Sequence, residues 1–416
     1  MTDNQLSLVN VPVEAMAGVP SQPAELDGRI DSLDLAYRET LLAVLLDGAE
    51  VTSSDEDSVG AGRITRERRN HSLEIPQATD RVVTCLGNCL RPMLAVGRFL
   101  WMMAGSDRLD DIRFYESKGL AGDRTKGVGG FSDDGLSVPG SNYGSRLFRP
   151  RPGTDQVAAC IRLIKEDPTT RRAAMTVYQP EDAGRASADI PCTFGVLLSP
   201  RDSALHLTVV MRSNNAWFLL PYNIFEFTLL GEIIASETGL KLGTYHHFAV
   251  SMHLYEEDWE RARRSIGSPS LELEAFPQMP PNSLSRVREL CIWESRIRYE
   301  HLGLNKRETQ AELKRLRRFG DYWEPFGRVV LVKALLNAGK DALATEVALA
   351  TGGPLGQLLR RELKLAGDIT STPSRVPEPS HALVERVHTE RQELTDAQRQ
   401  EGRFWMMVLR ERLPKE

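Results

Sequence analysis

The middle of the chain mixes strand-like and helix-like segments without regular alternation, and this mixture most limits the possible fold. Apolar patterning predicts strands at residues 173–178, 193–198, 205–212 and 244–255. Helical periodicity predicts helices over 157–165 and 224–238. A doubly wound parallel sheet needs a helix between successive strands, so this order favours an α+β layer structure.

Helical patterns dominate on both sides of this region. Residues 33–46 and 90–104 predict helices, and beyond residue 300 helices are predicted at 307–318, 326–350, 354–366 and 391–410. We therefore predict a flexible arm over 1–30, a mixed domain over 31–300 and an all-α extension over 301–416. The basic face of 307–318 is more typical of a solvated helix than of a phosphate or partner surface.

Composition excludes several classes of protein. The 416 residues are 41% hydrophobic and 26% charged with a net charge of −5, which is typical of a globular core without general attraction to nucleic acid. No apolar run reaches the ~20 residues that span a bilayer, and the first residues lack the pattern of a secretory signal. Five scattered cysteines suit a reducing compartment. We expect a cytoplasmic protein that binds neither membrane nor nucleic acid.

The cysteines also predict no metal site. Cys85 and Cys89 have CxxxC spacing, but no second pair of Cys or His ligands follows nearby to complete a zinc tetrahedron. Cys192 is different in its setting, because Pro191 precedes it and it opens a predicted strand. Free cysteines are usually small core residues, so its position alone is a weak signal of a nucleophile.

The polar residues around Cys192 strengthen that signal. Arg212 and Ser213 end the following strand, and the adjacent pair Arg171 and Arg172 offers a second clamp for an anion. Asn223 opens the next helix with an amide that both donates and accepts hydrogen bonds.

The last predicted strand carries two further candidates, His253 and Tyr255, which alternate onto one face. We also expect one face of this strand to carry apolar and ring side chains, His246, Phe248, Val250, Met252 and Leu254. For His246 and His247, packing or hydrogen bonding at a sheet edge is favoured over catalysis.

Five sequence blocks together resemble the thymidylate synthase superfamily. They are YGSRLF (143–148), DPTTRR (167–172), PC (191–192), RSNN…LPYN (212–223) and HLY (253–255), in that family's order and at its spacings. The resemblance extends from about Tyr37 to Asp258. It implies a thymidylate-synthase-like mixed β-sheet flanked by helices, and a homodimer whose two sites share residues across the interface.

The resemblance also implies a role for each matching residue. Cys192 corresponds to the nucleophile that adds to C6 of a pyrimidine, and Tyr143 to a tyrosine beside the reacting carbon. Asn223 corresponds to the residue that hydrogen-bonds O4 and N3 of uracil. The remaining matches divide between the phosphate, held by Arg212 and Ser213 and by Arg171 and Arg172 of a second subunit, and the sugar 3′-hydroxyl, contacted by His253 and Tyr255.

Elementary chemistry agrees with these roles. C6 is a poor electrophile, so the thiolate must stay reactive, and a guanidinium such as that of Arg212 lowers the pKa of a nearby thiol. Three arginines and a serine suit a phosphate dianion. An amide at position 223 can match uracil, whereas a carboxylate there would favour the amino group and ring nitrogen of cytosine.

This chain departs from the family pattern on the side of the folate and the proton relay. Arg98 occupies the position of a family glutamate three residues before Trp101, Thr193 replaces a histidine, and Asn215 replaces the aspartate that holds the pterin. The aromatic residue predicted to flank the folate is Phe114 rather than tryptophan.

Two further departures concern the phosphate and the tail. Ser58 stands where the family has a phosphate arginine, although Arg63 or Arg66 of the same loop can substitute. More than 100 predominantly helical residues replace the family's short apolar tail.

Two classes of function remain open. In the first, the protein transfers a one-carbon unit from 5,10-methylenetetrahydrofolate to C5 of a uridylate-type nucleotide, giving a methyl or, if water captures the intermediate, a hydroxymethyl product. We favour methylation. In the second, Cys192 serves another reaction, or the fold binds a nucleotide without folate chemistry, because fold does not fix function.

Overall fold

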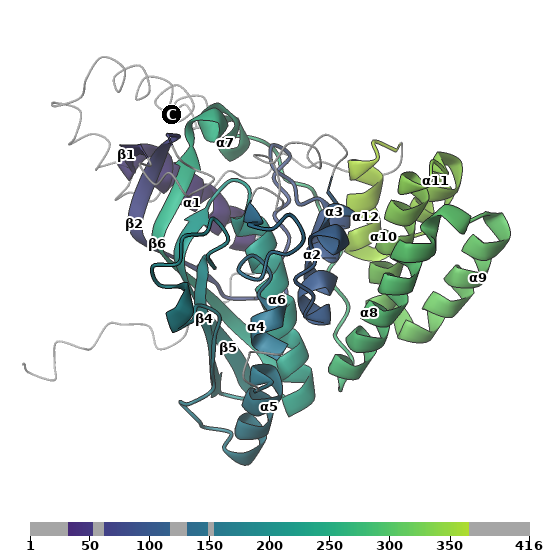
Figure 1. Ribbon diagram of the computed structural model, residues 1–416, viewed down its shortest axis with the longest axis horizontal. Helices are drawn as coiled ribbons and strands as arrows, with labels where there is room; N and C mark the ends of the chain where they lie inside the picture. The colour runs from purple at the N-terminus through teal and green to yellow at the C-terminus, as the bar shows by residue number, and fades with distance from the viewer. Residues whose placement is uncertain (1–31, 53–61, 117–130, 149–153, 366–416) are drawn as a thin grey trace, which may run out of the picture. The chain divides into compact units, whose positions relative to one another are not determined.

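A six-stranded mixed sheet forms one layer of the protein (Figure 1). The computed structural model describes residues 32–52, 62–116, 131–148 and 154–365. The strand order is β1-β2-β6-β5-β4-β3, and all neighbouring pairs are antiparallel except β5 and β6, which are parallel. The strands are β1 (Ala49–Thr52), β2 (Ile64–Ile75), β3 (Ala174–Thr176), β4 (Thr193–Arg201), β5 (Ala204–Asn215) and β6 (Lys241–Tyr255).

Helices make up most of the remaining described structure. Those before residue 270 are α1 (Ser32–Asp47), α2 (Pro92–Ala104), α3 (Leu109–Arg113), α4 (Gly144–Phe148), α5 (Gln156–Glu166), α6 (Leu220–Thr238) and α7 (Trp259–Ile266). Those after it are α8 (Ser283–Glu300), α9 (Lys306–Leu316), α10 (Gly320–Asn337), α11 (Asp341–Leu349) and α12 (Gly353–Glu362). The predicted α+β class is therefore confirmed.

Most predicted elements of the middle region are present, and the misses have physical causes. The predicted strand at 173–178 is shorter, as β3, and the predicted helix over 326–350 is two helices separated at Gly339, whose φ of 71° breaks the first. No strand was predicted where β2 lies, because its charged side chains hide the apolar alternation of its second half. The predicted arm over 1–30 and the helix over 391–410 lie outside the described residues.

One prediction about β6 is wrong. His246, Phe248 and Val250 lie on the outer face of the sheet, whereas Met252 and Leu254 are fully buried on the other face. Tyr245 and Ala249 are buried with them, so the alternation changes phase between Ala249 and Met252. Regular alternation of side chains along a strand does not predict such an irregularity, which moves every later side chain to the opposite face of the sheet.

The two faces of the sheet differ. On the buried face α6 packs against β5 and β6, and α1 packs against β2 and β6. On the outer face, Leu197 of β4 is 49% exposed and lies in register with Thr208 and then His246, while Val250 on the same face is 47% exposed. Large apolar side chains on an open sheet face are typical of an interaction surface.

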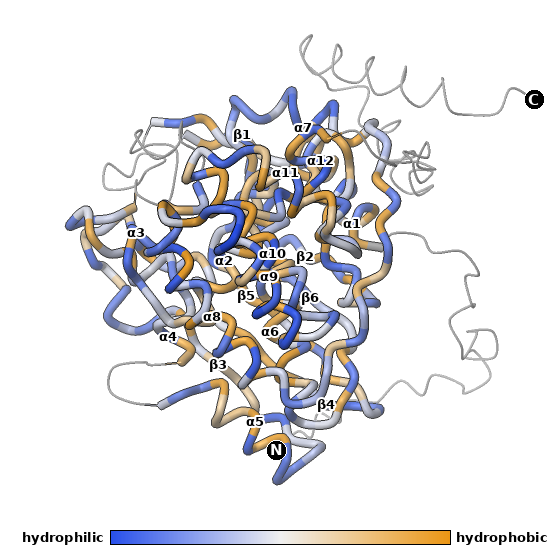
Figure 2. Tube along the Cα trace, turned by 90° about the vertical axis from the view of Figure 1, so that its right-hand side faces the viewer, coloured by the Kyte–Doolittle hydropathy of each residue, from blue (hydrophilic) through white to orange (hydrophobic). Residues whose placement is uncertain are grey.

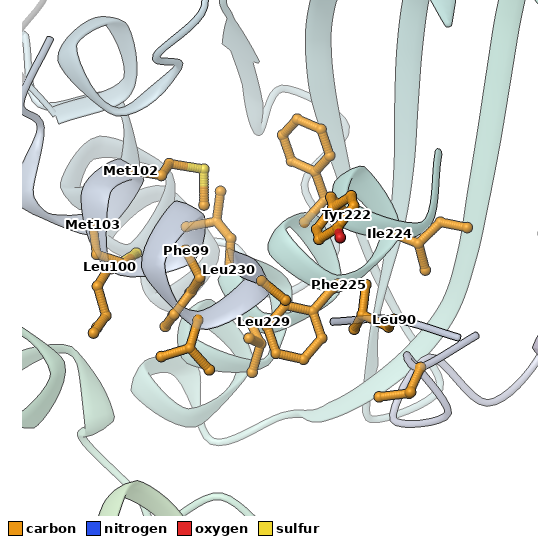
Figure 3. Close-up of a cluster of buried hydrophobic side chains, with 14 of the residues drawn as sticks. Leu90, Phe99, Leu100, Met102, Met103, Tyr222, Ile224, Phe225, Leu229 and Leu230 are labelled. Carbon is orange, nitrogen blue, oxygen red and sulfur yellow. The ribbon is translucent and has the colours of Figure 1, made fainter. Parts of the chain in front are cut away.

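Helix α2 lies between α6 and α10 and connects the sheet layer to the helical region (Figure 1). Every residue of α2 from Pro92 to Met103 is buried. Phe99 stacks on Trp323 of α10 with the ring centroids 6.2 Å apart, and Phe225 of α6 stacks on Phe326 of α10 at 6.4 Å. Figure 3 shows the packed apolar side chains of α2 and α6, with Phe99 beside Leu230. The helices after residue 300 thus share a core with α2 and α6.

The hydropathy of the chain agrees with this packing. Orange and blue segments alternate along the helices in Figure 2, as expected for helices that bury one side. Among the described residues, no helix is both long enough and apolar enough to cross a membrane.

Candidate active site

The loop that carries Cys192 is fixed by Arg212 at the end of the neighbouring strand. The backbone N–H of Arg212 donates to the carbonyl of Cys192 (2.8 Å). Its guanidinium donates from Nε to the carbonyl of Pro191 (2.8 Å) and from Nη2 to that of Ile190 (2.9 Å). The charge predicted to bind an anion therefore also fixes the backbone beside the sulfur.

Cys192 is half-buried, whereas Cys85, Cys160 and Cys291 are buried. Burial raises the pKa of its thiol, the nearby Arg212 guanidinium opposes that rise, and the Asp189 carboxylate adds to it. The side chain is therefore mainly a thiol at neutral pH in the free protein. The positive charge of Arg212 stabilises the thiolate form and so limits the rise in the pKa of the thiol.

Two tyrosines lie next to this sulfur. Burial, followed by the charge of Cys192, raises the pKa of Tyr143, whose hydroxyl also hydrogen-bonds the side chain of Thr193. For Tyr255, burial raises the pKa, Arg63 lowers it and Cys192 raises it. Both phenols are therefore protonated at neutral pH and can act as hydrogen-bond donors beside the nucleophile.

Arg212 and Ser213, predicted for the phosphate, lie with His253 and Tyr255, predicted for the sugar, at the ends of β5 and β6. The Ser213 hydroxyl is 3.3 Å from Nδ1 of His253, whose ring contacts that of Tyr255 edge-on at 5.3 Å. Burial is the main cause that lowers the pKa of His253 to about 4, so the imidazole is neutral at pH 7. Arg63 covers the Tyr255 ring, with Cζ 3.4 Å from its centroid.

This placement bears on the missing phosphate arginine. Ser58 lies outside the described residues. Of the two candidates to replace that arginine, Arg66 is committed elsewhere, because it donates to the Leu45 carbonyl (2.8 Å) and lies over the Trp259 ring. Arg63 also pairs with the carboxylate of Glu257, but it is the better placed of the two, since it lies over Tyr255 beside the sugar and phosphate residues.

Asn223 lies in the first turn of α6 with an amide that has no partner. The side chain is 1% exposed, and neither Oδ1 nor Nδ2 makes a hydrogen bond to any residue that the structure describes. An unpaired buried amide costs roughly 1–3 kcal/mol, so such a group is expected to serve a ligand. A pyrimidine edge, with one donor and one acceptor, is a chemical match for it.

Asn214 shows the same feature and was missed as a site residue by the sequence analysis. It is fully buried on β5, and both of its amide atoms are unpaired among the described residues. The motif containing it was recognised, but sequence alone gave no reason to separate it from its neighbours.

Arg171 and Arg172 lie far from Cys192 of their own chain. They precede β3, whose Ala174 pairs with Leu197, and Arg201 at the end of β4 donates to the carbonyl of Thr169 (3.0 Å). Cys192 precedes the opposite end of β4, about 25 Å away along the strand. Within one chain, then, these arginines cannot join the Cys192 site.

Comparison with known proteins decides the family. The family model for thymidylate synthase matches residues 94–305, slightly more than half of the chain. The chain belongs to the thymidylate synthase family. It is 29% identical over 210 residues to a deoxyuridylate hydroxymethyltransferase of Bacillus phage SP01, covering 48% of this chain and 52% of that protein.

Other matches come from cellular organisms. The chain is 30% identical over 124 residues to a putative thymidylate synthase of Methanosarcina barkeri, covering 30% of this chain and 57% of that protein. It is 30% identical over 127 residues to a thymidylate synthase of Encephalitozoon cuniculi, covering 30% and 42%. The chain thus spans about half the length of the curated relatives it matches.

The two residues that the thymidylate synthase resemblance predicts for folate do not fit that cofactor as they stand. The single side-chain oxygen of Asn215 already accepts from the backbone N–H groups of Trp217 (2.9 Å) and Phe218 (2.8 Å), which leaves only a donor for a ligand. The Phe114 ring packs edge-on against Tyr115 and against His301 after α8. Folate binding at these residues therefore stays a prediction.

Arg98, at the position of the family glutamate, is paired with a carboxylate that the sequence analysis missed. Its Nε donates to Oε1 of Glu226 on α6 at 2.5 Å, and both residues are buried. One signal could have indicated the facing helix, although not which carboxylate: α2 contains a single charge, Arg98, and the buried run of α6 contains two of opposite sign, Glu226 and Glu232.

We expect the reactivity of Cys192 to depend on pH and on Arg212. Only the thiolate is alkylated, and the pKa of the thiol is raised, so the rate of iodoacetamide labelling at residue 192 should still be rising above pH 9. Arg212→Gln removes the charge that lowers this pKa and should slow labelling about 10-fold at pH 8. Peptide mass spectrometry gives the rate at this cysteine.

The matched control for this experiment is Arg201→Gln, at the far end of the same β-hairpin. It removes one positive charge without changing the surroundings of the sulfur, so labelling of Cys192 should keep the wild-type rate. Equal rates for Arg212→Gln and the wild type would show that the guanidinium does not act on the thiol.

Proposed function

We propose that this protein is a one-carbon transferase that acts on C5 of a dUMP-like nucleotide through a covalent bond between Cys192 and C6. The observation that carries the proposal is the amide of Asn223, which is buried and unpaired among the described residues, together with a half-buried Cys192 beside Arg212. These groups supply what such a reaction first needs: recognition of the ring and a nucleophile at C6.

The side chains divide the work by their chemistry. Asn223 binds the ring edge, and the neutral imidazole of His253 with the Tyr255 hydroxyl binds the sugar. Arg212 and Arg63 attract the phosphate, which brings further negative charge to the site. Tyr143, protonated and adjacent to both Cys192 and Thr193, holds a proton near the reacting carbon. Once Sγ has added to C6, C5 becomes the nucleophile for the one-carbon unit.

We propose methylenetetrahydrofolate as the one-carbon donor because the chain belongs to the thymidylate synthase family. The contacts of Asn215 and Phe114 do not support this choice. We keep methylation as the proposed outcome. Hydroxymethylation is the second candidate, because the relative from phage SP01 is a deoxyuridylate hydroxymethyltransferase and Phe114 packs against the helical region. Formation of dihydrofolate, followed by absorbance, separates the two, since only methylation oxidises the folate.

Release of tritium from C5 of labelled dUMP tests the central step. We expect the wild type to release tritium with methylenetetrahydrofolate present, and a mass shift on the Cys192 peptide to report the adduct. Cys192→Ser should reduce release by at least 1,000-fold, because a hydroxyl is a far weaker nucleophile at neutral pH. Its affinity for dUMP should stay within about threefold of the wild type.

The controls for this assay identify the alternatives. Release without any folate indicates another reaction of Cys192. Tight binding of dUMP without release indicates a protein that binds nucleotide but does not transfer carbon. Loss of both folding and binding in Cys192→Ser would assign the cysteine a structural role and contradict the proposal.

Asn223→Asp tests how the base is recognised. A carboxylate cannot donate to O4 of uracil but accepts from the amino group of cytosine, so the ratio of dUMP to dCMP affinity should fall by about 100-fold. Calorimetric titration of both nucleotides measures the ratio. Asn337→Asp on α10 is the control and should leave the ratio of affinities unchanged. An unchanged ratio in Asn223→Asp would show that this amide does not recognise the base.

We further propose that the protein forms a homodimer through the outer face of its sheet. Leu197 and Val250 are exposed there, and Arg171 and Arg172 lie too far along the sheet to reach the Cys192 of their own chain. A second copy can bring its own pair of arginines to that site.

Two charges placed on this face should separate the subunits. The variant carrying Leu197→Glu and Val250→Glu should sediment as a monomer at micromolar concentration and lose most tritium release. Leu302→Glu, which replaces an even more exposed apolar side chain just after α8, should remain dimeric. A monomeric wild type would contradict the proposal.

A further inference from the structure

The pairing of Arg98 with Glu226 is a feature that neither the fold nor the proposed reaction has yet used. Arg98 is in the middle of α2, Glu226 is on α6, and they are 8% and 2% exposed. Two buried charges cost several kcal/mol to desolvate, and apolar replacements of such pairs are often no less stable. Packing alone therefore gives no reason for this pair.

The pair lies beside the groups predicted to bind the ring. Glu226 follows Asn223 by three residues, so the two side chains leave the same side of α6 one turn apart. The charges that act on the Tyr143 hydroxyl are those of Cys192, Arg98 and Glu226. The sulfur and the ion pair, which come from three separate segments, thus lie around one tyrosine, and the ring-binding amide lies one helical turn from Glu226.

The pair leaves the arginine with donors to spare. Glu226 engages Nε of Arg98, and Cζ lies 5.9 Å from the Tyr222 ring centroid. The two terminal nitrogens make no hydrogen bond to any other residue that the structure describes. A guanidinium held by one edge, with its remaining N–H groups open, can bind an oxygen that gains negative charge.

The proposed reaction creates such an oxygen. When Sγ of Cys192 bonds to C6, the C5=C6 electron pair moves through C4 to O4 and forms an enolate. In the folate-dependent reaction C5 then bonds to the one-carbon unit and gives up its tritium to water, so tritium release measures the step that follows the enolate. A carboxylate near O4 can assist by transferring protons. An arginine cannot, because it does not give up its proton at neutral pH.

We propose that Arg98 donates hydrogen bonds to O4 of the nucleotide and stabilises this enolate by charge, with Glu226 as the positioning residue that orients the guanidinium. This inference rests on the proposed function and deepens it. The pair replaces the proton-relaying carboxylate that the family has at position 98. It makes the first step depend on a fixed positive charge rather than on a titrating acid.

Substitutions at both positions test the inference, with tritium release and dUMP affinity measured together. Removing one donor to such an oxyanion typically costs 10²–10³ in rate. We therefore expect Arg98→Gln, and the apolar double variant Arg98→Met with Glu226→Leu, to exchange at least 100-fold more slowly while binding dUMP within about threefold. Arg98→Lys keeps the positive charge but loses the planar set of guanidinium N–H donors, so its rate of tritium release should fall about 10-fold. Glu226→Gln should lose a similar factor.

The matched control is Glu232→Gln, also on α6. Glu232 accepts from Nη2 of Arg81 at 2.5 Å and from the Tyr322 hydroxyl at 2.6 Å, and it is buried. This substitution disrupts a buried ion pair of the same kind six residues further along the helix. Its exchange rate per folded molecule should equal that of the wild type.

The outcomes separate failure of the inference from failure of the proposed function. A wild type that neither binds nor exchanges dUMP contradicts the function itself, and the inference with it. A wild type that exchanges, together with any folded variant lacking a positive charge at residue 98 that exchanges within threefold of it, contradicts the inference alone. If the double variant does not fold, Arg98→Gln and Arg98→Lys give the same decision.

Discussion

The burial of α6 on all sides is the constraint on which the rest of the site depends. Every residue from Leu220 to Ala235 is buried between the sheet and α2. Each polar side chain in that run must therefore find a partner inside the protein. Glu226 has Arg98, Glu232 has Arg81 and Tyr322, and the Thr228 hydroxyl donates to the Ile224 carbonyl. Among the described polar groups of this helix, Asn223 is left over, and a ligand is its natural partner.

The departures from the family pattern form a connected set in the structure. Replacing a carboxylate by Arg98 would leave an unpaired buried cation, but Glu226 neutralises it from the facing helix. The helical region packs Trp323 and Phe326 against α2 and α6, which carry these two charges. The charge introduced at position 98 is thus matched by a carboxylate on the facing helix.

Much of this could be predicted from sequence because the signals are local. Cys192 next to Pro191, the Arg212–Ser213 pair and Asn223 are short motifs, and their spacing was enough to place them at the ends of β5 and the start of α6. The phase change in β6 between Ala249 and Met252 was not predictable, because nothing in the local pattern specifies where a strand breaks its alternation. Glu226 was missed for a related reason, since its partner is 128 residues away in the chain.

The sequence by itself determined the α+β class and singled out Cys192 and the polar residues of its neighbouring motifs as site candidates, since these depend on periodicity and short motifs that the chain carries locally. Only the tertiary structure decided that Asn223 is unpaired, that Arg63 rather than Arg66 lies over Tyr255, and that Arg98 meets Glu226. Those facts concern which distant side chains meet in a buried space, where an unmatched charge or amide is costly. Such matching is a property of the packed fold rather than of any segment of the chain.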